Sequence, residues 1–246
     1  MKKLSTILGT LVFAGNIFAA DATADFSAAN KLYAQGKFTE AAGAYEAILA
    51  TGAQSSALLF NDANAQFKSG HLGRAIAGYR RAELLAPRDP DIRANLAFVR
   101  NQVHGATVRE SRWRDWVGAL TLNEGTLLTV FFFWGLFALL VARQFRPELA
   151  LKLRGATRLA LFLTVFCGAV LVLQAANHFN ASVAVVTAGE ATARSGPWDD
   201  AQTVFTARDG AELSVLNRRD DWVQVVDGSG KPGWLPLKQV EVLPGA

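Results

Sequence analysis

The sequence contains very little cysteine, with only Cys167 in 246 residues. A single thiol cannot form a disulfide within the chain, and it cannot complete a CxxC pair or a zinc-binding set. This count does not exclude an exported protein, because exported proteins can fold without disulfides. We therefore predict a fold without a covalent or metal framework, in which Cys167 is a small apolar residue.

Histidine is also scarce, and the motifs of common catalytic sites are missing. The three histidines lie in different segments, and none has a histidine partner four residues away: His71, His104 and His178. The chain has no Walker motif, no GxSxG and no HExxH. We therefore expect no enzyme activity, no cofactor and no metal. An envelope hydrolase is the rival hypothesis, and it lacks a recognisable set of acid, base and nucleophile.

Charge is nearly balanced except in one short stretch. The formal net charge is +4, and the stretch from Ala142 to Arg158 holds five cations against the single acid Glu148. This patch accounts for the whole imbalance, and no other basic face is evident. We therefore expect no nucleic-acid partner.

The N-terminus has the order of a secretory signal. Lys2 and Lys3 precede an uncharged segment from Leu4 to Phe18, which is followed by small residues. The motif Ala20-Asp21-Ala22 predicts a signal peptide over residues 1–22, with Ala22-Thr23-Ala24 as a neighbouring cleavage motif. An uncleaved membrane anchor is the alternative. In both cases the following segment is exported.

An internal repeat follows the signal. "LYAQGKFTEAAGAYEAIL" and "QFKSGHLGRAIAGYRRAEL" align at an offset of 34 residues, the period of tetratricopeptide repeats. The matching pairs are Tyr33 and Phe67, Gly36 and Gly70, Phe38 and Leu72, Ala41 and Ala75, and Tyr45 and Tyr79. The glycine permits a tight turn between two helices, and the alanine permits their close approach. We predict an all-α tetratricopeptide repeat domain over residues 25–103, made of two repeats and the capping helix "DIRANLAFVRNQV".

Resemblance to this repeat family implies a concave groove for a peptide or protein partner. The groove positions of the family correspond to Asn30, Tyr33, Phe60, Asn64, Phe67 and Lys68. For Tyr33 and Phe67 the alternative is a role as core filler, and for Asn64 and Lys68 it is simple solvation. The carboxylate-clamp pattern of chaperone-binding repeats is not met, because Phe26 and Asp91 stand where that pattern has lysines.

Two long apolar segments predict transmembrane helices over residues 120–142 and 159–179. The stretch Gly125–Ala142 has no charge, and eighteen helical residues rise about 27 Å, enough for the hydrocarbon core of a bilayer. The linker over residues 104–119 carries Trp113 and Trp116 among arginines, as is typical at the headgroup level. The rival is a helical hairpin buried inside a soluble domain. A small domain offers too little surface to cover Phe131–Trp134 on all sides of a helix.

The basic stretch is the loop between these two spans, residues 143–158. Short loops rich in lysine and arginine stay in the cytoplasm. The predicted topology anchors are Arg143, Arg146, Lys152, Arg154 and Arg158. Both ends of the chain are then periplasmic and the protein lies in a bacterial inner membrane. Three cations at the outer end of the first span oppose this rule, but they are fewer than the five in the loop: Arg109, Arg112 and Arg114.

The segment over residues 182–244 predicts a small all-β domain. Short β-branched runs alternate with turn residues, and Asp227–Gly230 is the expected turn of a hairpin. "ATARSGP", "DGAELSVL", "DWVQVV" and "GKPGWLPLKQVEVL" together resemble a bacterial SH3-like (SH3b) barrel. The tyrosines of the peptide site are absent, and Gln239 stands in place of one of them. Trp222 and Trp234 are a candidate ligand platform, with a core position as the alternative for Trp234.

The order of these segments predicts a multidomain protein and resembles the tetratricopeptide and SH3-domain component of the bacterial aerotolerance (Bat) operon, the BatE-like family. That resemblance implies a scaffold that works in envelope stress beside von Willebrand A-domain membrane proteins and a MoxR-type ATPase. The leading hypothesis is thus a membrane-anchored adaptor with protein partners. The alternative is a membrane protein that binds peptidoglycan through its SH3-like domain.

Overall fold

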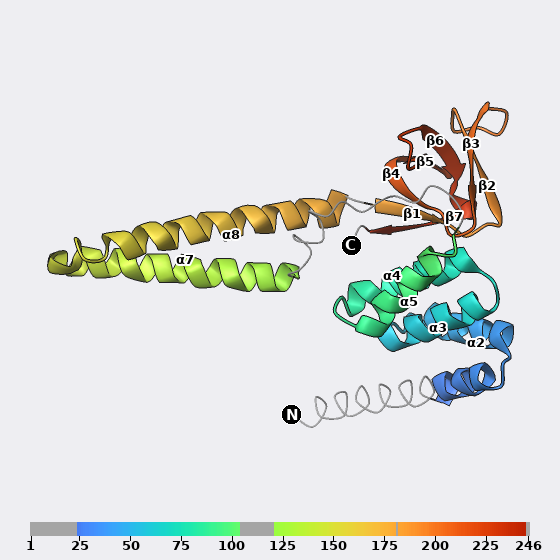
Figure 1. Cartoon of the computed structure of the whole chain (residues 1–246), viewed down its shortest axis with the longest axis horizontal. Coiled ribbons are helices and arrows are strands. Elements are labelled where there is room, and N and C mark those ends of the chain that lie inside the picture. Colours follow the sequence, from blue (N-terminus) through green and yellow to red (C-terminus); the bar gives the residue numbers. More distant parts are fainter. Residues whose placement is uncertain (1–23, 104–120, 181, 245–246) are drawn as a thin grey trace, which may run out of the picture. The chain divides into compact units, whose positions relative to one another are not determined.

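The computed structural model describes residues 24–103, 121–180 and 182–244 (Figure 1). The predicted signal peptide and linker lie outside the described residues, together with Trp113, Trp116 and the three arginines that oppose the charge rule. The chain divides into two units. The first unit holds the N-terminal helices together with residues 183–243. The second unit holds the two apolar helices, which come between these segments in the sequence.

The N-terminal segment is entirely helical where it is described. A helix over residues 24–34 is followed by α2 (Phe38–Ala50), α3 (Ser56–Lys68), α4 (Leu72–Leu85) and α5 (Pro90–Arg100), which we call the repeat helices. Gly36 and Gly70 have φ values of 78° and 87°, a left-handed conformation that favours glycine and permits the turn within each helix pair. Ser55 caps α3 by accepting a hydrogen bond from the backbone N–H of Leu58, and Asp89 caps α5 in the same way.

The 34-residue period of the sequence recurs as a repeated set of hydrogen bonds. In each set, the side-chain oxygen of an asparagine accepts two hydrogen bonds. One comes from a tyrosine on the second helix of the same pair, and the other comes from an asparagine on the first helix of the following pair. The bonds run from Tyr45 to Asn30 (2.6 Å), from Asn61 to Asn30 (3.0 Å), from Tyr79 to Asn64 (2.6 Å) and from Asn95 to Asn64 (3.4 Å). The helix over residues 24–34, α3 and α5 are therefore neighbours on one side of the stack.

The C-terminal segment forms an antiparallel sheet of seven strands, which we call the β domain. Its strands are β1 (Ser182–Val186), β2 (Glu190–Arg194), β3 (Thr203–Arg208), β4 (Glu212–Arg219), β5 (Trp222–Val226), β6 (Pro232–Pro236) and β7 (Val240–Pro244), with the short helix η2 (Leu237–Gln239) before the last. The strand order is β3-β2-β6-β5-β4-β1-β7. The expected turn joins β5 to β6, where Asp227 accepts hydrogen bonds from the backbone N–H groups of Ser229 and Lys231.

The repeat helices and the β domain share a hydrophobic core. Ile76 of α4 and Val99 of α5 belong to the same buried cluster as Val185 of β1 and Leu243 of β7. The approach is close enough that a Cβ on Gly73 would lie 1.9 Å from the carbonyl oxygen of Val186. The sequence places these segments in two domains, and the structure packs them into one unit.

A buried charge cluster crosses the same junction. Glu212 of β4 accepts a hydrogen bond from Nε of Arg80 on α4. It also accepts from Nε and Nη2 of Arg100 on α5, at 2.7 and 3.0 Å. Asp209 accepts from the backbone N–H of Gly73 at 3.0 Å, next to this cluster. The junction is therefore held by specific polar contacts as well as by apolar packing.

The second unit is a hairpin of two apolar helices, α7 (Leu122–Phe145) and α8 (Arg154–Asn180), with the short helix η1 (Pro147–Leu149) between them (Figure 1). Thr121 and Glu124 form a capping box at the start of α7. Both helices are long and apolar enough to cross a membrane, and 6% of each apolar window is buried. Threonine hydroxyls in the hairpin donate to carbonyls four residues earlier, so these polar groups are satisfied within their own helix.

Both helices extend further into the basic stretch than the expected spans do. The loop was predicted over residues 143–158, whereas α7 continues to Phe145 and α8 begins at Arg154. Long arginine side chains tolerate such positions, because their apolar stems can lie along a helix while the charged ends reach the interface.

Candidate binding surfaces

The predicted groove of the repeat helices contains an aromatic pair on α3 and α5. The rings of Phe67 and Phe98 meet edge to face, with 5.8 Å between their centroids. Nζ of Lys68 lies 5.9 Å from the centroid of the Phe67 ring, within the range of a cation–π interaction. The structure thus brings Phe67 and Lys68 together with a third residue, Phe98, which we did not anticipate.

Phe98 is the exposed aromatic ring of this surface. Its side chain is 56% exposed, although the residue lies on a packed helix whose other face buries Leu96 and Val99. The signal that could have revealed it is the period itself, since Phe98 follows Asn64 by 34 residues. Phe98 therefore occupies, on the last helix, the repeat position that Asn30 and Asn64 occupy on the two earlier ones.

The other predicted groove residues have structural roles as well. Asn30 and Asn64 accept the tyrosine hydroxyls described above, and burial raises the pKa of Tyr45 to about 12, so its hydroxyl stays protonated as a donor. Phe60 is half-buried and packs edge to face on Tyr79 at 5.8 Å. Tyr33 is half-buried against Phe38 at 5.2 Å. These four side chains pack within the stack of repeat helices, whereas Lys68 and Phe98 are exposed.

The β domain has a second aromatic surface on the outside of its sheet. Directly opposed residues of antiparallel strands lie on one face, and successive residues alternate between faces. Val223 pairs with Leu235, and both are buried, whereas Trp222 and Trp234 belong to the alternate positions and are half-buried. Trp234 therefore lies on the face opposite the core, as Trp222 does, and the two are one diagonal step apart.

Arg194 extends this outer face, and a further exposed tryptophan lies in the loop after β2. Arg194 of β2 pairs with Trp234 of β6, and its guanidinium donates to the carbonyl of Ala201 at 3.1 Å. Trp198, in the loop after β2, is 56% exposed. The face thus combines indole rings with one cation.

The comparisons with known proteins bear on this part of the chain. Residues 187–241 match the profile of the bacterial SH3 domain. We therefore refer to the β domain as the bacterial SH3 domain from here on. No curated protein matches the chain.

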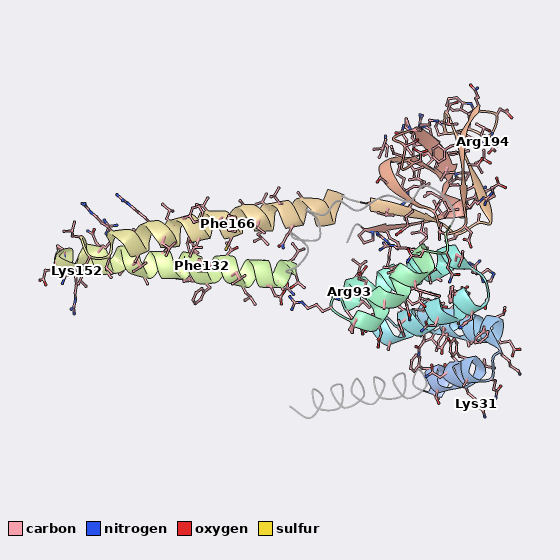
Figure 2. All side chains as sticks on the ribbon, in the orientation of Figure 1. Lys31, Arg93, Phe132, Lys152, Phe166 and Arg194 are labelled. Carbon is pink, nitrogen blue, oxygen red and sulfur yellow. The ribbon has the colours of Figure 1, made fainter. Side chains whose placement is uncertain are left out.

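The predicted topology anchors gather at one end of the hairpin. Arg143 lies in the last turn of α7, Arg146 follows it, and Arg154 and Arg158 lie in the first turns of α8. Lys152 lies in the turn between the two apolar helices (Figure 2). Within the described residues, no group of three or more His, Cys, Asp or Glu side chains is placed to hold a metal ion.

Proposed function

We propose that this protein is a membrane-anchored adaptor without catalytic activity. The repeat helices, which we assign to the tetratricopeptide family, hold a protein segment in their groove, and the bacterial SH3 domain packs behind them. The two apolar helices anchor this unit in the membrane. Phe67, Lys68 and Phe98 are the contact residues that we propose for the partner.

The observation that carries this proposal is the contact of the exposed Phe98 ring with the half-buried Phe67 ring. A phenylalanine that is half exposed to water contributes little to folding, and it is the kind of anchor that a partner side chain can cover. Lys68 beside the pair supplies a cation for an acidic or carbonyl group. The asparagine hydrogen bonds keep the three first helices in register, so the surface is formed before a partner binds.

The shared core supports a topology in which the repeat helices and the bacterial SH3 domain lie on the same side of the membrane. Residues 24–103 and residues 182–244 contact each other through buried groups, yet two helices long and apolar enough to cross a membrane separate them in the sequence. An even number of crossings is consistent with that contact. The basic turn at Lys152 and the exported N-terminus favour the periplasm for both parts and the inner membrane of a bacterium for the anchor.

The cellular role that we propose is in an envelope-stress complex of the aerotolerance type. It rests on the resemblance in domain order, which implies von Willebrand A-domain proteins and a MoxR-type ATPase as associates. Site-specific crosslinking tests the surface directly. A photo-crosslinking amino acid in place of Phe98 should capture a protein in native membranes, whereas the same group in place of exposed Arg93, elsewhere on α5, should not. Equal capture at both positions would exclude this groove as the docking surface.

A second function, binding to peptidoglycan, is favoured by one specific observation. Trp222 and Trp234 lie outside the core of the bacterial SH3 domain, and indole rings on an exposed sheet are suited to stacking on sugar faces. The full chain in detergent should then sediment with purified sacculi, and the double substitution Trp222→Ala and Trp234→Ala should abolish this. Phe98→Ala is the matched control, and it should sediment as the unmodified chain does.

A further inference from the structure

A charged cavity of about 300 Å³ lies between the repeat helices and the bacterial SH3 domain. It opens among α2, α3, α4 and β7. Its wall combines three acids, two arginines, the polar residues Gln66 and Thr187, and small or aliphatic residues. The charged residues are Glu46, Asp62, Arg74, Arg81 and Glu241. No aromatic residue lines it.

Four of these charges lie in oppositely charged pairs. Nη1 of Arg74 lies 3.6 Å from Oε1 of Glu46, and the same oxygen accepts a hydrogen bond from Nε2 of Gln66 at 2.7 Å. Nη1 of Arg81 lies 3.6 Å from Oε1 of Glu241. Each arginine thus neutralises one glutamate, and one acid remains.

The remaining acid is Asp62 of α3, and it is buried. Its residue is 7% exposed, and its Oδ1 has no hydrogen-bond partner among the described residues. Burial raises the pKa of Asp62 to about 7, and Glu46 and Glu241 add to this effect, while Gln66 and Arg81 oppose it. A buried carboxyl oxygen without a donor is costly unless a ligand supplies one.

We propose that this cavity binds a primary ammonium group, which donates to Asp62. The cavity is lined by three acids and two bases, so one bound positive charge would balance the charge of its wall when Asp62 is ionised. A divalent metal is a poor fit, because the three acids are not placed to share one ion. A quaternary ammonium is also a poor fit, since such groups are recognised by aromatic cages and the wall has none.

The cavity volume limits the ligand to a chain about the size of an amino acid, at the lower end of small-molecule sites. Two sources supply a primary ammonium on an alkyl chain of this length: a free diamine and a lysine side chain of a peptide. This site is separate from the groove around Phe98, so it is an addition to the proposed function and does not depend on it.

Binding should release a proton, because the ammonium requires the ionised form of Asp62. With a pKa of about 7 in the empty cavity, roughly a tenth of Asp62 is ionised at pH 6 and roughly nine tenths at pH 8. The amine stays protonated over this range. Affinity should therefore rise about tenfold from pH 6 to pH 8.

The test is calorimetric titration of the full chain in lipid nanodiscs with two amines, cadaverine and Nα-acetyl-lysine methylamide. Titration at pH 7 in buffers of different ionisation enthalpy measures the proton release. Pentanol is the uncharged control ligand. Asp62→Asn keeps the shape of the side chain and removes the charge, and Glu40→Gln removes an exposed carboxylate from α2.

We expect at least one amine to bind the unmodified chain and Glu40→Gln equally, with proton release and the rise towards pH 8. Asp62→Asn should bind at least about tenfold more weakly, with no proton release, because a charge-assisted hydrogen bond is lost. Preference for cadaverine would identify a free diamine as the source, and preference for the lysine derivative would identify a peptide. The proposal is overturned if neither amine binds at millimolar concentration, if pentanol binds as well, or if Asp62→Asn binds unchanged. None of these results changes the crosslinking expected at Phe98, so the ammonium site and the proposed docking surface can be refuted independently.

Discussion

Replacing Glu212 by glutamine should uncouple the repeat helices from the bacterial SH3 domain. Glu212 is 4% exposed and accepts hydrogen bonds from two arginines on two different helices, Arg80 and Arg100. Glutamine keeps the shape of the side chain but leaves two like charges around a neutral amide. The damage should be large because the Arg80 side chain is as deeply buried as Glu212.

The expected loss is about 3–5 kcal/mol of unfolding free energy, the range for removing one partner of a buried ion pair. For a folded unit of this size, each 1 kcal/mol lowers the Tm by roughly 2–4 °C, so the expected decrease is roughly 10 °C. The ion pair itself contributes less than this loss, because removing one partner also leaves the desolvation cost of the other partner.

Two optical signals report on the two parts of the full chain in nanodiscs. Circular dichroism follows the repeat helices. Three of the six tryptophans belong to the bacterial SH3 domain: Trp198, Trp222 and Trp234. With Trp113, Trp116 and Trp134 replaced by phenylalanine in every chain compared, the fluorescence follows that domain. In the unmodified chain both signals should change at one temperature, and in Glu212→Gln they should separate.

Glu190→Gln is the matched control, because Glu190 is an exposed acid at the start of β2 in the same sheet. It should melt within about 2 °C of the unmodified chain, as expected for an exposed side chain. A Glu212→Gln chain that also melts within 2 °C, with coincident signals, would refute the assignment of this cluster as the link between the two parts.

Three further tests concern other positions, the first of them with a matched control. In chemical denaturation, Gly210→Ala should lower the unfolding free energy by about 2 kcal/mol or more, because Gly210 has a φ of 83° and a Cβ there would lie 2.6 Å from Val103. Gly230→Ala is the control. Gly230 has the same φ but open space around it, so this variant should lose only about 1 kcal/mol. Asp62→Asn should remove part of the pH dependence of the unfolding free energy. The raised pKa of Asp62 makes the unfolding free energy of the unmodified chain fall as pH rises from about 4 to 7. The variant should therefore be more stable than the unmodified chain at pH 8 and no more stable than it at pH 4. Tyr79→Phe should cost about 1 kcal/mol, because it removes the hydroxyl donor of Asn64, and equal Tm values would contradict that role.

The local features of the fold could be predicted from the sequence because each has a short-range cause. The 34-residue offset appears in the structure as the pairing of Tyr45 with Asn30 and of Tyr79 with Asn64. The apolar runs appear as α7 and α8, and the turn at Asp227 joins two strands as expected.

The junction could not be predicted, since its causes are long-range. Arg80 and Glu212 are 132 residues apart in the sequence, and nothing in either local pattern points to the other. In a sequence, a charged residue on a helix usually indicates a solvated face. Asp62 was missed for the same reason, because only the three-dimensional packing shows that its carboxyl is enclosed.

The candidate surfaces contain residues that the sequence predicts and one that it does not. Phe67 and Lys68 follow from the repeat positions, and Phe98 was missed because the last helix was treated as a cap rather than as a third groove position. Trp234 illustrates the limit of composition: a tryptophan in a strand is often buried, and only the register with Val223 and Leu235 decides which face it occupies.

Sided labelling of single cysteines tests the central claim most directly, namely that the repeat helices and the bacterial SH3 domain lie together on one side of the membrane. In a Cys167→Ser background, Arg93→Cys, Lys231→Cys and Lys152→Cys report on the repeat helices, the SH3 domain and the hairpin turn. All three positions are exposed in the structure. A membrane-impermeant maleimide added to spheroplasts should label the first two, and the third only after permeabilisation. Labelling of the first two from opposite sides would contradict the shared core and the topology together.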